Sequence, residues 1–195
     1  MLESLLAWSQ SQFRQLRFEP ASLALGEEVE KVVGQLQQQA SDKSIPVQVD
    51  VPAGLWVHAD RQMLHLILRN LLSNAIKFSE AGKAVRLETA KSSSFIHVSV
   101  KDEGVGLSPE SISRLSGRNA DGFTSYGTKG EKGTGLGINL CMNCIEMHGG
   151  SLLIQSEEGR GSRFTFSLLA SAPEKNSGAL CSEGLKGCKS ALGLS

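Results

Sequence analysis

The sequence has 195 residues, 40% of them hydrophobic and 21% charged, which suffices for one substantial core but not for two full domains. Twenty Lys and Arg residues balance twenty Asp and Glu residues, so no long-range field draws the chain toward nucleic acid or an anionic membrane. No apolar run reaches the roughly 18 to 20 residues of a membrane-spanning helix, and the N-terminal segment lacks the basic start of a signal peptide. These features predict a cytoplasmic location, with any membrane attachment supplied by regions outside this sequence.

Apolar periodicity predicts helices and short strands that do not alternate regularly. Acidic residues in the first turn favour a helix over 26–44, and Asp60 is the expected N-cap of the next helix. Thr134 and the pair Gly149 and Gly150 should begin and end the last helix. The expected helices cover 2–16 (a truncated end), 26–44, 61–78 and 135–148, and the expected strands cover 45–51, 55–58, 83–90, 94–100, 151–157 and 162–169.

This order favours an α+β fold over a doubly wound parallel sheet. We expect residues 17–172 to form one two-layer sandwich, with a mixed, mostly antiparallel sheet covered by three helices. Residues 1–16 resemble the last turns of a longer helix. Residues 173–195 are rich in Ser, Gly and Lys, and their composition is typical of a linker or tail.

A polar arc runs along the predicted helix 61–78, beside its apolar stripe. Asn70, Asn74 and Lys77 are spaced by four and three residues, so they fall on one side of the helix. Carboxamide oxygens suit Mg²⁺, and a lysine ammonium suits phosphate. From this helix alone, a solvated polar face remains the more common alternative.

A carboxylate and two glycines follow the strand 94–100. Asp102 can accept a hydrogen bond from an exocyclic amine, while Gly104 and Gly106 let a flat base approach the backbone. This is no dinucleotide-binding fingerprint, because Pro109 stands at the third glycine position and no βαβ unit surrounds it.

A second glycine-rich string begins the last predicted helix. The string is Gly133-Thr134-Gly135-Leu136-Gly137, and the N–H groups at such a helix start bind anions. It is no P-loop, because Lys132 precedes Gly133 and no strand leads into it. Alone, this string is weak evidence for a nucleotide site.

The three motifs together, in this order, resemble the N, G1 and G2 boxes of the ATP-binding catalytic domain of sensor histidine kinases. They read NLLSNAIKFS, DEGVGL and GTGLGINL, and the resemblance extends from about Phe18 to Leu169. The family belongs to the superfamily of gyrase, chaperone, histidine kinase and mismatch-repair ATPases. The resemblance implies the Bergerat α/β sandwich, with ATP beneath a mobile lid over about Ser108 to Lys132. One departure is that Phe123 alone represents the family's phenylalanine-rich box.

The resemblance also implies roles for matching residues. Asn74, helped by Asn70, would coordinate Mg²⁺, Lys77 would contact phosphate, and Asp102 would accept from the adenine amine. Phe78 would lie near the base. The glycine-motif residues would shape the pocket and wrap the phosphates; they are Gly104, Gly106, Leu107, Gly133, Thr134, Gly135, Leu136 and Gly137.

Asn70 bears on the reaction type. The superfamily's hydrolysing members carry a glutamate there as the general base, which a carboxamide cannot replace near neutral pH. The resemblance therefore implies transfer to a histidine on a separate dimerisation domain, within a homodimer, and relay to the receiver domain of a response regulator. Residues 1–16 would be the truncated end of that domain's phosphoacceptor hairpin helix. The alternatives are an ATPase, a serine kinase of the same fold, and a degenerate nucleotide-binding module that only senses or scaffolds.

Overall fold

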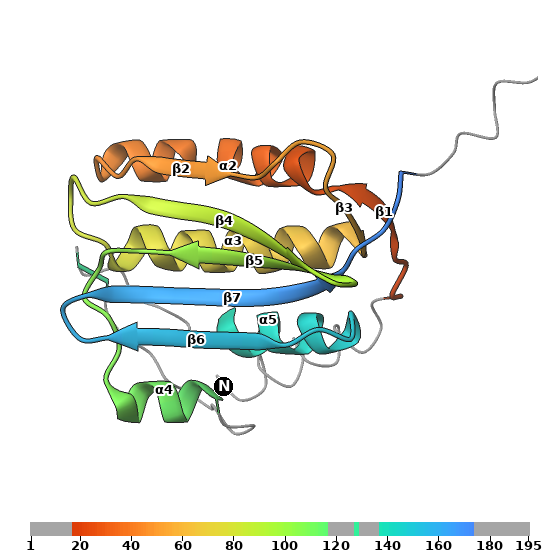
Figure 1. Cartoon of the computed structure of the whole chain (residues 1–195). Helices are drawn as coiled ribbons and strands as arrows, with labels where there is room; N and C mark the ends of the chain where they lie inside the picture. The colour runs from red at the N-terminus through yellow and green to blue at the C-terminus, as the bar shows by residue number, and fades with distance from the viewer. Residues whose placement is uncertain (1–16, 117–126, 129–136, 174–195) are drawn as a thin grey trace, which may run out of the picture.

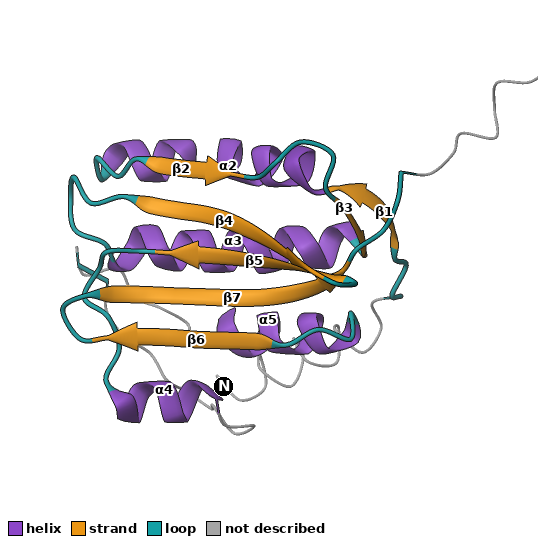
Figure 2. Cartoon of the chain, viewed as in Figure 1, coloured by secondary structure: helices purple, strands orange, loops and turns teal. Residues whose placement is uncertain are grey.

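We describe the fold from a computed structural model, which describes residues 17–116, 127–128 and 137–173 (Figure 1). The expected helix over 2–16 and the expected tail beyond residue 173 lie outside these ranges. The predicted α+β class is confirmed: a sheet forms one layer and helices form the other (Figure 2).

Two sheets are present in the described part of the chain. The larger sheet has five strands in the order β2-β4-β5-β7-β6, with β2 parallel to β4 and every other pair antiparallel. The smaller sheet is the antiparallel pair of β1 and β3. The strands are β1 (Ala21–Ala24), β2 (Val47–Asp50), β3 (Trp56–Ala59), β4 (Val85–Ser92), β5 (Phe95–Lys101), β6 (Leu152–Glu157) and β7 (Gly161–Leu169).

Three helices pack on one face of the large sheet, as expected. They are α2 (Leu25–Asp42), α3 (Arg61–Phe78) and α5 (Gly137–Met147), with α3 in the middle (Figure 1). Inward-facing strand residues such as Val98, Phe166 and Leu168 are fully buried against them. The core is therefore the interface between the two layers, and α3 lies at its centre.

Helix α3 forms where its sequence predicts. Its apolar residues recur at helical spacing, and Leu64, Ile67, Leu68 and Leu71 are at most 1% exposed. Asp60 is the predicted N-cap, because its carboxylate accepts a hydrogen bond from the Met63 N–H at 3.0 Å. The apolar stripe thus fixes the rotation of α3 and turns its polar arc away from the core.

The end of α5 also follows the prediction. Gly149 has a φ of 68°, and the N–H of Gly150 donates to the carbonyl of Ile145 at 3.0 Å. This left-handed ending is typical of glycine after a helix. The predicted N-cap of this helix, Thr134, lies outside the described residues, which resume at Gly137.

A fourth helix, α4 (Pro109–Ser116), lies within the expected lid of Ser108 to Lys132, where we predicted no helix. Ser108 accepts a hydrogen bond from the Ser111 N–H at 3.2 Å, and Pro109 occupies the first turn, where a missing N–H costs nothing. An ion pair of 3.0 Å joins Glu110 to Arg114 one turn later. The cap, the proline and the ion pair explain why this polar segment is helical. The expected lid residues 117–126 and 129–132 lie outside the described ranges.

Candidate functional site

The polar arc of α3 meets the start of α5. Asn70 donates from its carboxamide nitrogen to the Leu66 carbonyl at 3.0 Å. Its Oδ1 atom lies 2.8 Å from the position that a β-carbon on Gly137 would take. Asn74 follows one turn later on the same helix and is partly exposed. The structure therefore brings Asn70 and Gly137 together.

Asp102 is a buried carboxylate directly after β5. It is 4% exposed, and its Oδ1 atom accepts hydrogen bonds from the N–H groups of Gly104 at 2.9 Å and Ser162 at 3.2 Å. Burial raises the pKa of Asp102, while the two backbone hydrogen bonds act in the opposite direction. The two bonds hold the carboxyl group in a fixed orientation beside the glycines.

Gly104 and Gly106 occupy positions where a side chain would collide with backbone. A β-carbon on Gly104 would lie 2.3 Å from the carbonyl oxygen of Phe78, at the end of α3. One on Gly106, whose φ is 68°, would lie 2.0 Å from the carbonyl oxygen of Glu157. Leu107 donates its N–H to Ser156 at 2.8 Å, so this segment is fixed between α3 and β6.

The last residues of α3 carry two further predicted site residues. The Lys77 ammonium nitrogen lies 4.8 Å from the centroid of the Phe78 ring. The N–H of Val105 donates to the Phe78 carbonyl at 3.2 Å, which joins the end of α3 to the glycine segment after Asp102. Lys77, Phe78 and Gly104 thus lie at one edge of the helical layer.

Two residues that the sequence analysis did not single out bind the same helix end. Lys43 is 5% exposed, and its ammonium group donates to the carbonyl of Ile76 at 3.1 Å and to that of Lys77. Thr128 donates its N–H to the Lys77 carbonyl at 3.2 Å, and its hydroxyl lies 2.9 Å from the Ser79 carbonyl. No local pattern marks these residues, because their partners are about 33 to 51 positions away in the sequence.

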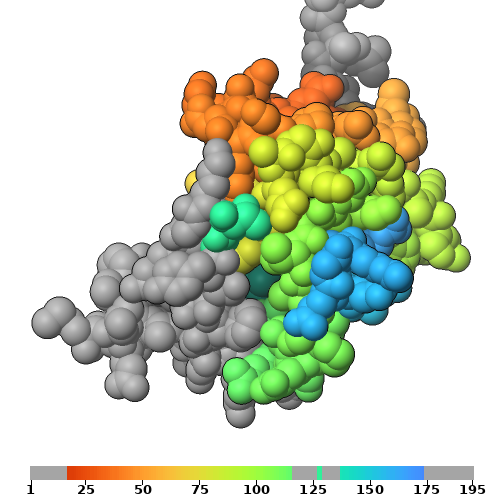
Figure 3. Space-filling view, turned by 90° about the vertical axis from the view of Figure 1, so that its left-hand side faces the viewer, coloured from red at the N-terminus to blue at the C-terminus, as the bar shows by residue number. Residues whose placement is uncertain are grey.

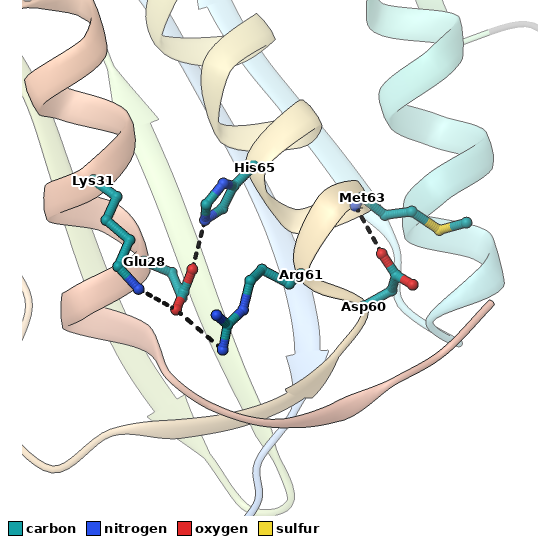
Figure 4. A network of polar contacts seen from close by, with 6 residues as sticks. All are labelled: Glu28, Lys31, Asp60, Arg61, Met63 and His65. Carbon is teal, nitrogen blue, oxygen red and sulfur yellow. Dashed lines mark hydrogen bonds and ion pairs between the residues drawn. The ribbon is translucent and has the colours of Figure 1, made fainter. Parts of the chain in front are cut away.

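A second polar cluster lies at the opposite end of α3 (Figure 4). Glu28 is 2% exposed, and its carboxylate lies 2.5 Å from His65, 2.9 Å from Lys31 and 3.7 Å from Arg61. Burial acts most strongly on the pKa of Glu28 and would raise it. The hydrogen bonds from Lys31 and His65 and the nearby positive charges outweigh burial, so the pKa lies below its ordinary value. This cluster joins α2 to α3 far from Lys77.

The glycine string is described only in part. Gly133, Thr134, Gly135 and Leu136 lie outside the described residues, so only Gly137 of that motif is placed. Within the described ranges, His, Cys, Asp and Glu side chains form no group of three that could hold a metal ion. Among the described residues, the carboxamides of Asn70 and Asn74 offer oxygen atoms of the kind that Mg²⁺ prefers.

The family model for "Histidine kinase-, DNA gyrase B-, and HSP90-like ATPase" matches residues 59–172, more than half of the chain. The chain belongs to this ATPase family. The match begins at the end of β3 and runs past β7, so it includes α3, Asp102 and the start of α5.

The curated relatives of this ATPase-family chain include sensor kinases. Sporulation kinase C of Bacillus subtilis is 38% identical over 111 residues, covering 57% of this chain and 24% of that protein. The adaptive-response sensory kinase SasA of Crocosphaera subtropica is 30% identical over 170 residues, covering 86% of this chain and 44% of that protein. The chain thus spans less than half of the length of these relatives.

Solved structures agree with the family assignment. The catalytic domain of histidine kinase ThkA is 25% identical with a TM-score of 0.65, and the match covers 77% of this chain and 95% of that chain. The mycobacterial sensor histidine kinase MprB has the same fold, with a TM-score of 0.67 at 21% identity over 79% of this chain and 99% of that chain. No helix among the described residues has the length and hydrophobicity to cross a bilayer.

Proposed function

We propose that this chain binds ATP with Mg²⁺ and transfers the γ-phosphate to a histidine on a separate dimerisation domain of the same protein, for relay to a response regulator. The supporting observation is the convergence of three features of the family site. Asp102 is buried beside the glycine segment, Lys77 and Phe78 end α3 next to that segment, and Asn70 faces Gly137.

Asp102 is the proposed adenine contact. Its Oδ1 atom is engaged by two backbone N–H groups, so Oδ2 is the oxygen that we assign to the exocyclic amine of adenine. Gly104 and Gly106 keep side chains out of the adjoining space, and Phe78 would lie near the base. This arrangement would orient the nucleotide with its phosphates toward α3 and α5.

Asn70 and Asn74 are the proposed Mg²⁺ ligands. The donor set fits, because Mg²⁺ is usually held by one or two protein oxygens together with phosphate oxygens. The carboxamide nitrogen of Asn70 donates a hydrogen bond to the Leu66 carbonyl, so the Asn70 Oδ1 atom is the one directed toward Gly137. The ion would neutralise phosphate charge, while Lys77 would supply a further positive charge to the phosphates. Gly133, Thr134, Gly135, Leu136 and Gly137 would provide the N–H groups that wrap the phosphates.

Asn70 also supports transfer over hydrolysis, because a carboxamide cannot take a proton from water near neutral pH.

Two histidines of the described chain already have partners within the fold. The Nε2 atom of His148 accepts the N–H of Asp60 at 2.9 Å, and His65 contacts Glu28. The remaining two, His58 and His97, lie in strands β3 and β5. We therefore place the phosphate acceptor on another domain. Because the proposed reaction consumes ATP, we place this chain in the cytoplasm.

Phosphate transfer from radiolabelled Mg-ATP tests this proposal. The chain would be incubated alone and with a separately supplied dimeric hairpin that carries the acceptor histidine. We expect acid-labile, base-stable label on the hairpin only, and weakly, because the tether that raises effective concentration is missing. The Asn74→Ala variant is the negative control.

ATP bound without transfer would indicate a sensing module, and rapid release of free phosphate would indicate an ATPase. Label on a histidine of this chain would contradict an external acceptor.

A further inference from the structure

The C-terminal turn of α3 receives hydrogen bonds from three separate segments. The last carbonyls of a helix have no partner within the helix and need donors from elsewhere. Lys43, just after α2, donates to the carbonyls of Ile76 and Lys77. Val105 donates to one carbonyl from the glycine segment, and Thr128 donates from the segment between α4 and α5. In Figure 3 the blue-green pair of residues 127 and 128 lies against the orange and yellow surface of the chain near this turn.

Thr128 bonds on both sides of Phe78. Its N–H donates to the Lys77 carbonyl at 3.2 Å, and its hydroxyl is 2.9 Å from the Ser79 carbonyl and 3.3 Å from the Lys77 carbonyl. A hydroxyl has a single proton, and the shorter contact assigns it to Ser79. The two donors of one residue therefore hold the carbonyls that flank Phe78.

The position of Phe78 matters for the proposed nucleotide site. Its own carbonyl accepts from Val105 and leaves no room for a β-carbon on Gly104. Rotation of the peptides around Phe78 would therefore move the Phe78 ring, the Lys77 side chain beside it and the glycine segment after Asp102. The Thr128 hydroxyl opposes that rotation from outside the helix.

We propose that Thr128 is a positioning residue for the nucleotide site, acting through the backbone of Lys77 and Ser79 to hold Lys77 and Phe78 in their binding orientation. This inference rests on the proposed ATP-binding function. Thr128 need not touch the nucleotide itself. A residue that only stabilised the fold would change the free energy of unfolding and leave nucleotide affinity unchanged.

The test is calorimetric titration of the whole chain with Mg-ATP, with urea unfolding of each variant. Thr128→Val removes the hydroxyl but keeps the shape and the N–H, and Thr128→Ser restores the hydroxyl. Thr165→Val is the matched control. It also removes a threonine hydroxyl that makes a hydrogen bond, 2.8 Å to Ser99, but this bond joins two strands of the sheet and does not touch α3. All four proteins would be measured under the same conditions.

We expect Thr128→Val to raise the Kd for Mg-ATP by roughly three- to tenfold, the loss expected of one hydrogen bond. Thr128→Ser should bind within about twofold of the parent, and Thr165→Val should lose stability with an unchanged Kd. Equal Kd values for the parent and Thr128→Val would overturn the inference while leaving the ATP-binding proposal intact. An equal rise in Thr165→Val would also overturn it. A parent chain that binds no Mg-ATP would overturn both.

Discussion

Gly104 packs so closely against Phe78 that a β-carbon at position 104 would lie 2.3 Å from the Phe78 carbonyl oxygen. This contact joins the end of α3 to the segment that follows Asp102. Glycine is needed at position 104 because any side chain would collide with the Phe78 carbonyl. The backbone angle is not the reason, since Gly104 is not in the left-handed region.

Gly104→Ala should therefore lower the free energy of unfolding by about 2 to 3 kcal/mol, because the clash is with backbone that cannot rotate away. Mg-ATP affinity should fall as well, since the glycine segment must shift. Urea unfolding and calorimetry would measure the two effects.

Gly34→Ala is the control, because Gly34 lies in α2 with nothing within 4 Å of its β-carbon position. That change should stabilise the chain by about 0.5 to 1 kcal/mol. A stable, tightly binding Gly104→Ala protein would contradict the packing described for this segment.

Asp102→Asn should separate nucleotide selectivity from folding. The new carboxamide keeps an oxygen that can accept from Gly104 and Ser162, and this places its nitrogen donors toward the exocyclic amine of adenine. Two facing donors disfavour ATP by about 1 to 3 kcal/mol, so the preference for ATP over GTP should shrink. Competition titrations with both nucleotides would measure it, with thermal unfolding as the check on folding. Unchanged affinity and selectivity would show that Asp102 has only a structural role.

Glu28 should make stability depend on acidic pH. Its pKa in the folded chain lies below its ordinary value of 4.5, so the unfolded chain binds the proton more tightly. The stabilising contribution is therefore complete above about pH 4.5 and is lost as the pH falls through the lower, folded-state pKa.

Glu28→Gln should accordingly lower the free energy of unfolding by about 2 kcal/mol at pH 7, and the difference from the parent should be smaller at pH 3. Urea unfolding at both pH values checks this expectation. The matched control is Glu30→Gln, because Glu30 is exposed on the same helix. A Glu28 effect that is equally large at pH 3 would mean that charge does not hold this cluster together.

Lys43→Met should destabilise the chain although no sequence motif includes this residue. The substitution keeps the apolar length of the side chain but removes the ammonium that donates to the Ile76 and Lys77 carbonyls inside the fold. Loss of a charged donor there should cost about 1.5 to 3 kcal/mol. Thermal or urea unfolding would measure the loss, with Lys83→Met as the control at an exposed turn after α3. Equal effects of the two substitutions would mean that the Lys43 contacts do not support the helix end.

Features of the fold that depend on near neighbours in the sequence follow from local pattern. The Asp60 cap, the apolar stripe of α3 and the helix end at Gly149 depend on neighbours within a few residues, and all three predictions are confirmed. The spacing of Asn70, Asn74 and Lys77 is a consequence of the same helix. Their assigned roles stay predictions.

Features that depend on distant partners were not predictable from pattern. Lys43 and Thr128 have ordinary local sequences, and their importance appears only when α2 and residue 128 are brought to the end of α3. The pairing of β1 with β3 is likewise set by tertiary contacts, since each strand has only four residues. Helix α4 was not predicted for another reason: its Ser-Pro-Glu start lies within the segment that the family resemblance assigned to a lid.

Calorimetric titration of the 195-residue chain with ATP in the presence and absence of Mg²⁺ tests the central claim most directly. We predict one site per chain that binds ATP more tightly with Mg²⁺ than without it. Asn74→Ala should remove most of that Mg²⁺ dependence while leaving some affinity for the base. The opposite result, no binding at millimolar Mg-ATP by a folded chain, would contradict the proposal that α3, Asp102 and the start of α5 form an ATP site.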